Sequence, residues 1–200
     1  MLQSRTAFYI MAVTSVIIAL SSYRFLFLDL ETAFSYMPSH IDNRLTAFML
    51  HISLAPIALI LGVIQFSSKI RTNMPALHRW TGRIYGVCVL VAGIAGLVIA
   101  IGAEGGFVAA TGFALLSLAW MFTTFMGVQH VRNCRFEEHR RWMIRSFALT
   151  LAGVTLRIQL LGFTLFGMEY TDASLYLAWL CWIPNLLVVE WWIRRRDKVS

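Results

Sequence analysis

Six long apolar runs constrain this chain more than any other feature of its sequence. Each run holds about 20 residues, the length that a helix needs to cross the hydrocarbon core of a bilayer. The runs are continuous rather than alternating, so they predict helices and not the strands of a membrane barrel. The predicted spans cover residues 7–29, 45–66, 80–101, 108–131, 142–163 and 173–193. The expected fold class is therefore all-α, a polytopic membrane protein with six transmembrane helices.

The composition leaves no room for a second domain. The 200 residues are 58% hydrophobic and only 14% charged, whereas a soluble domain carries roughly 25% charged residues. Residues 1–200 are therefore expected to form a single integral membrane domain. The first run also has small residues that would suit signal cleavage, Ala19, Ser21 and Ser22, but its apolar character continues past them to Leu28, which favours a retained span.

The basic residues predict how the chain is oriented. The net charge is +7, and the Lys and Arg residues lie mostly in segments 67–79 and 132–141 and in the C-terminal RRRDKVS. The only charged residues in segments 102–107 and 166–172 are acidic. Because cytoplasmic loops are enriched in Lys and Arg, we expect a bacterial inner-membrane protein with both termini in the cytoplasm. This orientation explains the positive charge without any nucleic-acid partner.

Residues 31–43 and the sixth span allow further predictions of local structure. Residues 31–43 are polar and are expected to form a loop, in which His40 is an ordinary loop residue. Pro184 is expected to interrupt the sixth span, because proline removes a helical hydrogen bond. Glu190, near the inner end of that span, is expected to pair with an arginine.

Small residues follow one face of the third predicted span. The stripe consists of His78, Gly82, Gly86, Val89, Gly93 and Gly96, at steps of three or four. Small residues on one face allow helices to approach closely in lipid. Similar stripes in the second, fourth and fifth spans carry His51, His130 and His139, and the stripe of the fifth span also includes Ser146 and Thr150. The pattern predicts a four-helix core built from spans two to five.

Counting residues from the predicted boundaries places His51 and Arg157 in the outer half of the membrane, His51 about 10 Å below the surface at 1.5 Å per residue. Arg24 and Gln159 are expected near them. An arginine inside a span costs about 2.5–3.5 kcal/mol and marks a candidate functional site. Arg157 either clamps an anion, such as a propionate, a quinone oxygen or a lipid phosphate, or has a structural partner such as Glu104 or a backbone carbonyl.

The remaining histidines form an inner layer at the cytoplasmic ends of spans three to five. Facing histidines on bundle helices can hold haem, which gives His78 and His139 as candidate axial ligands, with His130 as a competitor. Arg83 and Arg145 would then pair with the haem propionates. The alternatives are a zinc or copper ion on the three histidines, or ordinary interfacial residues without a ligand.

Two stretches of this sequence resemble a known family. LHRWTGRIYG, from residue 77, and EHRRWMIRSFALTLAGVTLRI, from residue 138, are similar to the paired signatures of an uncharacterised bacterial membrane-protein family, domain of unknown function 2306. The resemblance covers roughly spans two to six. It implies a membrane protein and supplies no activity.

The architecture is also similar to that of the six-helix di-haem cytochromes b of the b-561 type. In those proteins, histidine pairs join the second helix to the fourth and the third to the fifth. His78 and His139 match the second pairing. The first pairing is broken, because the fourth span carries His130 at the end opposite to His51. The resemblance therefore implies one haem or none.

The leading functional hypothesis from the sequence is a small inner-membrane redox protein that binds haem b and exchanges electrons with quinone. The alternative is a cofactor-free transporter or assembly scaffold, with a site for an anionic solute or lipid at His51 and Arg157. The sequence holds no catalytic motif that supports an enzyme.

Overall fold

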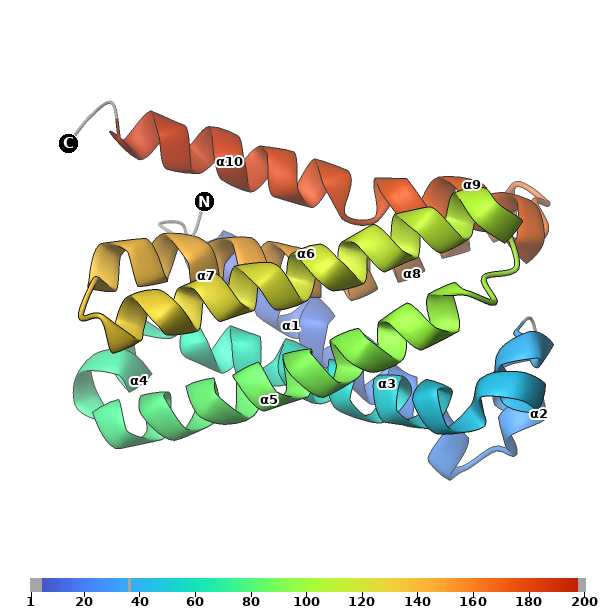
Figure 1. The fold of residues 1–200 in the computed structure, drawn as a ribbon, viewed down its shortest axis with the longest axis horizontal. Helices are drawn as coiled ribbons and strands as arrows, with labels where there is room; N and C mark the ends of the chain where they lie inside the picture. The colour runs from blue at the N-terminus through green and yellow to red at the C-terminus, as the bar shows by residue number, and fades with distance from the viewer. Residues whose placement is uncertain (1–4, 36, 198–200) are drawn as a thin grey trace.

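The computed structural model describes residues 5–35 and 37–197, and every regular element within them is helical (Figure 1). Six helical stretches are long and apolar enough to cross a membrane, which confirms the predicted fold class. The elements are α1 Arg5–Ser22, η1 Tyr23–Leu26, α2 Leu30–Ala33, α3 Pro38–Gln65, α4 Ser68–Asn73, α5 Pro75–Ala100, α6 Gly106–Arg132, α7 Phe136–Thr150, α8 Ala152–Leu165, α9 Tyr170–Leu180 and α10 Ile183–Asp197.

The core is a four-helix bundle. Helix α3 packs against α5, α5 against α6, and α6 against α7, while α7 also touches α3. Helix α1 lies on the outside of α3, and α9 and α10 lie on α6 and α7. Side chains from all four core helices meet in one cluster that includes Ala58, Tyr85, Trp120 and Leu149. This packing confirms the predicted core from spans two to five.

Glycines make two of the close helix contacts. A Cβ atom on Gly62 of α3 would overlap the Phe147 ring of α7, and one on Gly96 of α5 would meet Ser117 of α6 and then His51 of α3. A Cβ atom on Gly86, which shares the predicted stripe with Gly96, would meet no atom within 4 Å among the described residues. The small-residue face of α5 therefore packs tightly in one part and borders open space in another.

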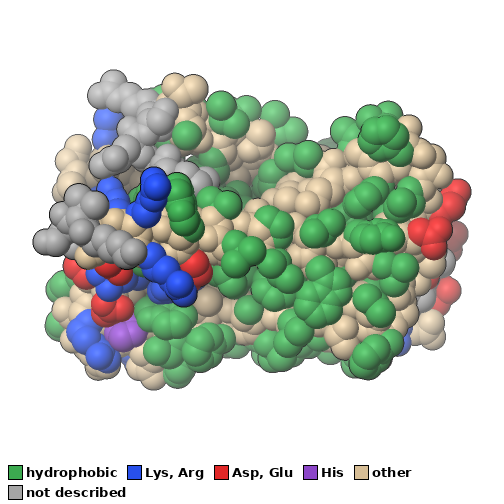
Figure 2. All heavy atoms as spheres, turned by 90° about the horizontal axis from the view of Figure 1, so that it is seen from above, with side chains coloured by type: hydrophobic (Ala, Val, Ile, Leu, Met, Phe, Trp, Pro, Cys, Tyr) green, Lys and Arg blue, Asp and Glu red, His purple; other side chains and the backbone are tan. Residues whose placement is uncertain are grey.

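The charges separate the bundle into two ends. We call the end with α4, the 133–135 link and the C-terminal part of α10 the basic end, and the end with α2, the 101–105 link and the 166–169 link the acidic end. Figure 2 shows most Lys and Arg gathered at one end together with some acidic side chains, mainly acidic side chains at the other end, and hydrophobic side chains between the two. This separation agrees with the charge asymmetry of the predicted loops.

Three segments that the sequence predicts as loops, 31–43, 67–79 and 132–141, are largely helical, so those predictions were wrong. Helix α3 already begins at Pro38, since proline suits the first turn of a helix, and α2 fills part of the preceding segment. His40 is consequently a buried helical residue, 6% exposed, rather than a loop residue. Helix α7 begins at Phe136, and Glu137 and Glu138 in its first turn complement the helix dipole.

The fifth and sixth spans are each broken near mid-membrane. Helix α7 gives way to α8 at Leu151, and α9 gives way to α10 just before Pro184. Only the second break was predicted. Asn185 joins the two, because its Nδ2 donates to the carbonyl oxygens of Ala148, at 3.2 Å, and Cys181, at 3.1 Å. Backbone groups that a break exposes at membrane depth need such internal partners.

Candidate functional site

A cavity of about 230 Å³ lies in the acidic half of the core. In the basic half, α7 packs against α3, but its continuation α8 packs mainly against α9 and α1. The core therefore closes at the basic end and opens towards the acidic end, between α3 and α8. Residues from α1, α3, α5, α6 and α8 line the opening, among them Ser22, His51, Gly96, Ser117 and Arg157.

Arg157 lies on the cavity wall, where two neutral acceptors hold it. Its Nη1 donates to the Gly153 carbonyl oxygen at 2.9 Å, and its Nη2 donates to the Ser22 hydroxyl at 2.8 Å. The first bond ties the side chain to its own helix and the second to α1. The structural alternative for Arg157 is thus present, since a backbone carbonyl is one of its partners. The anion clamp stays a prediction, and the guanidinium borders the cavity in which an anion would have to bind.

Arg24 brings a second guanidinium to the same cavity. Its Nε donates to the Ala33 carbonyl oxygen at 2.7 Å, and its Cζ lies 4.3 Å from the centre of the Phe34 ring. A cation over an aromatic face is favourable, most of all away from water. The hydrogen bond and the ring fix the position of a second positive charge beside the cavity.

Two histidines also lie on the wall of the cavity. His51 Nδ1 lies 2.9 Å from the Ala92 carbonyl oxygen; because a carbonyl only accepts, Nδ1 carries the proton and Nε2 is left as an acceptor. His40 Nδ1 is buried and has no hydrogen-bond partner among the described residues. Buried polar atoms in native proteins are normally paired, so a ligand or water at this point of the cavity would satisfy His40.

Most of the remaining wall is apolar. It includes aromatic and aliphatic side chains of four helices, such as Phe48, Ile52, Phe113, Leu116 and Leu160. Ligand pockets typically combine an apolar lining with a few fixed polar groups. The arrangement fits a molecule with a hydrophobic body and a head that accepts hydrogen bonds from cationic groups.

The cavity also borders the irregular points of three spans. Pro56 within α3, Thr150 and Ala152 at the α7–α8 break, and Cys181 at the α9–α10 break all contribute to its wall. Broken helices at membrane depth are found where they line a cavity, and in transporters they mark the substrate site.

A hydroxyl network reaches the cavity wall at Trp120 and Thr150. Tyr85 OH contacts Ser146 Oγ at 2.6 Å and Thr150 Oγ1 at 2.8 Å, and Trp120 Nε1 donates to Thr150 Oγ1 at 2.8 Å. Thr124 extends the network through Ser146 at 2.7 Å. The network ties α5, α6 and α7 together. Sequence reasoning placed Ser146 and Thr150 on the core face of the fifth span but missed Tyr85, which a glycine-based stripe does not reveal.

The other predicted outer residue lies elsewhere. Gln159 is on α8 but is absent from the cavity wall, and its Nε2 donates to the Leu180 carbonyl oxygen at 3.1 Å. The structure therefore brings His51, Arg157 and Arg24 to one cavity and places Gln159 on the neighbouring contact with α9. His40, which sequence reasoning set aside, joins the first group.

At the basic end, the three histidines of the predicted inner layer are engaged with protein groups or buried among them. His139 Nδ1 lies 2.8 Å from the Gly127 carbonyl oxygen, and the His130 ring stacks on Trp142 with centroids 6.5 Å apart. The Nδ1 atoms of His78 and His130 are buried without a partner among the described residues. None of the three belongs to the wall of the cavity.

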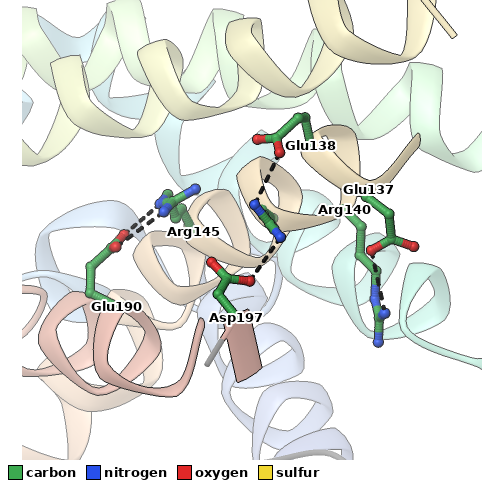
Figure 3. A network of polar contacts seen from close by, with 7 residues as sticks. Glu137, Glu138, Arg140, Arg145, Glu190 and Asp197 are labelled. Carbon is green, nitrogen blue, oxygen red and sulfur yellow. Dashed lines mark hydrogen bonds and ion pairs between the residues drawn. The ribbon is translucent and has the colours of Figure 1, made fainter. Parts of the chain in front are cut away.

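The arginines at this end have partners of their own. Arg145 forms a two-bond ion pair with Glu190, and Arg141 bridges Glu138 at 3.0 Å and Asp197 at 2.7 Å (Figure 3). The Arg145 pair confirms that Glu190 binds an arginine. Arg83 lies on the exposed surface with its guanidinium 5.0 Å from the Trp80 ring centre.

These contacts decide how well a haem fits the basic end. His139 fits, because a carbonyl on Nδ1 leaves Nε2 available to a metal, as in ligating histidines. The two propionate partners do not fit, since Arg145 is bonded to Glu190 and Arg83 lies on Trp80. Within the described residues, no group of three or more His, Cys, Asp or Glu side chains is arranged to hold a metal ion. Haem binding by His78 and His139 therefore stays a prediction, and Arg83 and Arg145 are engaged elsewhere than the prediction requires.

Fold and site together define a polytopic α-helical membrane protein with a cationic, mostly apolar cavity in one half of the bilayer. The chain belongs to the family described as "Predicted membrane protein (DUF2306)", whose model matches residues 48–193, well over half of the chain. The match covers the third to sixth predicted spans in full and nearly all of the second. A search of curated proteins and a search of solved structures gave no match.

Proposed function

We propose that this protein binds an amphipathic anion in the cavity between α3 and α8, with the anionic head at Arg157 and Arg24 and the hydrophobic body along the apolar wall. The observation that carries the proposal is the presence of two fixed guanidinium groups on one mostly apolar cavity at membrane depth. Guanidinium groups recognise carboxylates and phosphates with paired hydrogen bonds, and such bonds are strong where water is scarce.

The role in the cell that suits this site is transport or presentation of a lipid-like molecule. Broken spans beside the cavity support a transporter-like site, and the hydrophobic wall supports entry from the bilayer. In our proposal the protein resides in the bacterial inner membrane, the basic end faces the cytoplasm, and the cavity takes its ligand from the outer leaflet. The charge asymmetry of the two ends supports this orientation.

Binding of hexadecyl phosphate to the detergent-solubilised protein, compared with hexadecanol in a scintillation proximity assay, tests the proposal. Arg157→Gln should weaken the binding of hexadecyl phosphate by about 10–100-fold, which corresponds to the loss of a charge-assisted hydrogen bond. The affinity for hexadecanol should stay nearly unchanged. Arg83→Gln, at an exposed arginine of the basic end, is the control. Equal binding of phosphate and alcohol to the wild type would refute an anion site.

A cavity-filling variant makes the test independent of charge. Leu160 lines the cavity, while its neighbour Leu161 does not and is 62% exposed. Leu160→Trp should abolish saturable binding, and Leu161→Trp should retain it. If both variants bind like the wild type, the ligand lies outside this cavity.

The native Cys134 offers a test of orientation. It is exposed at the basic end, whereas Cys88 and Cys181 are buried. A membrane-impermeant maleimide should label the protein in inverted vesicles and not in intact spheroplasts. Labelling in spheroplasts alone would reverse the proposed orientation.

A redox protein with haem b on His78 and His139, exchanging electrons with quinone, is the second candidate. One observation favours it, namely the Nδ1 bond of His139 to a carbonyl, which leaves Nε2 for a metal. A reduced-minus-oxidised visible spectrum of protein expressed with haem supplied tests it. Sharp α and β bands that vanish in His139→Ala would support this function, and a flat spectrum from folded protein would eliminate it.

A further inference from the structure

A second cavity, outside the four-helix core, lies in the basic half between α1 and α10. Its volume is about 250 Å³ and its floor is formed by α7. Val188 on its rim is 45% exposed, so the cavity opens on the surface that faces the bilayer. We call it the α1–α10 groove. It is distinct from the cavity described above, and no described residue lines both.

The lining of the groove suits hydrocarbon. Among the described residues, Asn185 is the only side chain on its wall with an amide or charged group, and that amide already donates to Ala148, Cys181 and Thr155. The other lining side chains are apolar apart from the indole of Trp192. A polar or charged ligand would find no hydrogen-bond partner among these side chains, whereas an alkyl chain has no hydrogen bonds to give up on entering the groove.

The length of the groove matches one leaflet. Along α10 the wall runs from Pro184, at the mid-membrane break, to Trp192, near the basic end. Eight residue steps correspond to about 12 Å of helix, and one leaflet contributes about 15 Å of hydrocarbon. An acyl chain that enters at the basic surface would therefore reach the break between α9 and α10.

Positive charge stands at the open end of the groove. Trp192 belongs to its wall, and the Arg196 guanidinium lies 4.5 Å from the centre of the Trp192 ring. Arg194 and Arg195 are exposed next to it. Two ion pairs, Arg145 with Glu190 and Arg141 with Asp197, fix this part of α10 against α7 (Figure 3), so the groove has one fixed wall and a cationic mouth.

We propose that the α1–α10 groove is a specific binding site for an anionic phospholipid of the leaflet at the basic end. One acyl chain fills the groove, and the phosphate lies at Arg196 above Trp192. The site holds the lipid as a fixed part of the protein's surface and is independent of the ligand proposed for the core cavity. A neutral lipid would fill the same groove without the contribution of the arginine.

Native mass spectrometry of the delipidated full-length protein, titrated with dioleoyl phosphatidylglycerol or dioleoyl phosphatidylcholine, tests the site. We expect one tightly bound molecule of phosphatidylglycerol and an affinity for phosphatidylcholine that is about fivefold lower, because one basic residue near a membrane surface contributes about 1 kcal/mol. Arg196→Gln should remove the preference and retain binding. Equal affinity of the two lipids for the wild type would overturn the assignment.

A variant that fills the groove distinguishes lipid bound there from annular lipid and from a ligand in the core cavity. Val188→Trp should eliminate the tight adduct, whereas Leu187→Trp, on the adjacent residue that is 63% exposed and outside the groove, should keep it. Leu160→Trp, which fills the core cavity, should also keep it. If Val188→Trp and Leu187→Trp bind phosphatidylglycerol alike, the lipid does not occupy the groove. Arg196→Gln still decides the question if Val188→Trp does not fold.

Discussion

The two halves of the four-helix core treat polar side chains in opposite ways. In the acidic half, Arg24, Arg157 and His51 surround a cavity. In the basic half, Arg145 is paired with Glu190, and Tyr85 is bonded to Ser146 and Thr150. The polar groups of the basic half thus bind one another, whereas those of the acidic half are bonded to neutral groups, such as the Ser22 hydroxyl and the Ala92 carbonyl oxygen, and border a cavity. Helix α7 packs against α3, whereas α8 packs mainly against α9 and α1, so the boundary between the two arrangements falls near the break at Leu151.

The largest effect on stability is expected at the ion pair of the basic half. Arg145→Gln leaves the Glu190 carboxylate, 28% exposed, without its partner. Removing one member of a buried pair costs about 3–5 kcal/mol, and partial exposure places this pair near about 3 kcal/mol. The midpoint of SDS-induced unfolding in mixed micelles measures the loss. The double variant Arg145→Gln, Glu190→Gln should recover part of it, and no recovery would mean that the pair does not act as a unit.

The next effect concerns the closed contact between α3 and α7. Gly62→Val should destabilise the fold by about 1–3 kcal/mol, because the added side chain overlaps the Phe147 ring in a packed core. Gly86→Val is the matched control, since a Cβ atom there meets no described atom within 4 Å. Unfolding midpoints of the two variants should differ clearly. Equal loss at both positions would show that the cost comes from the helix backbone rather than from the contact.

The hydroxyl network should contribute less. Tyr85→Phe removes the OH group that contacts Ser146 and Thr150, and interhelical hydrogen bonds in membrane proteins are worth about 0.6 kcal/mol on average. We expect a loss of about 1 kcal/mol for the two contacts in the same unfolding assay. A loss above about 3 kcal/mol would exceed what two such bonds contribute and would mean that Tyr85 organises the core beyond them.

The smallest effect is expected at the wall of the core cavity. Leu160→Phe places extra volume on this wall and should change stability by less than about 0.5 kcal/mol, while Leu54→Phe, packed on the Tyr85 and Trp120 cluster of the core, should cost about 1–3 kcal/mol. Thermal unfolding in detergent distinguishes the two. Similar losses would indicate that the cavity wall cannot accommodate a larger side chain.

Much of the architecture was predictable from properties of short stretches of the sequence, such as hydropathy and residue spacing. Hydropathy gave the six spans, small-residue stripes gave the four-helix core, and residue counting brought His51, Arg157 and Arg24 to one depth, where the structure has them on one wall. The helix over residues 38–43 and the buried place of His40 were not predicted. Polar residues at a membrane boundary suit a loop and a helix end equally, and only packing against α2 and Phe48 distinguishes them.

The sequence by itself determined that this chain crosses a membrane six times and how its charge is distributed between the two ends, because apolar length and loop charge are properties of contiguous residues. Only the tertiary structure decided which polar groups meet. The break at Leu151 is not marked by a proline, yet beyond it α8 packs mainly against α9 and α1 rather than α3, and the cavity lies between α3 and α8. Arg145 and Arg157 lie on one predicted span, but the first has a carboxylate partner, whereas the second is bonded to Ser22 and to the Gly153 carbonyl oxygen and borders the cavity.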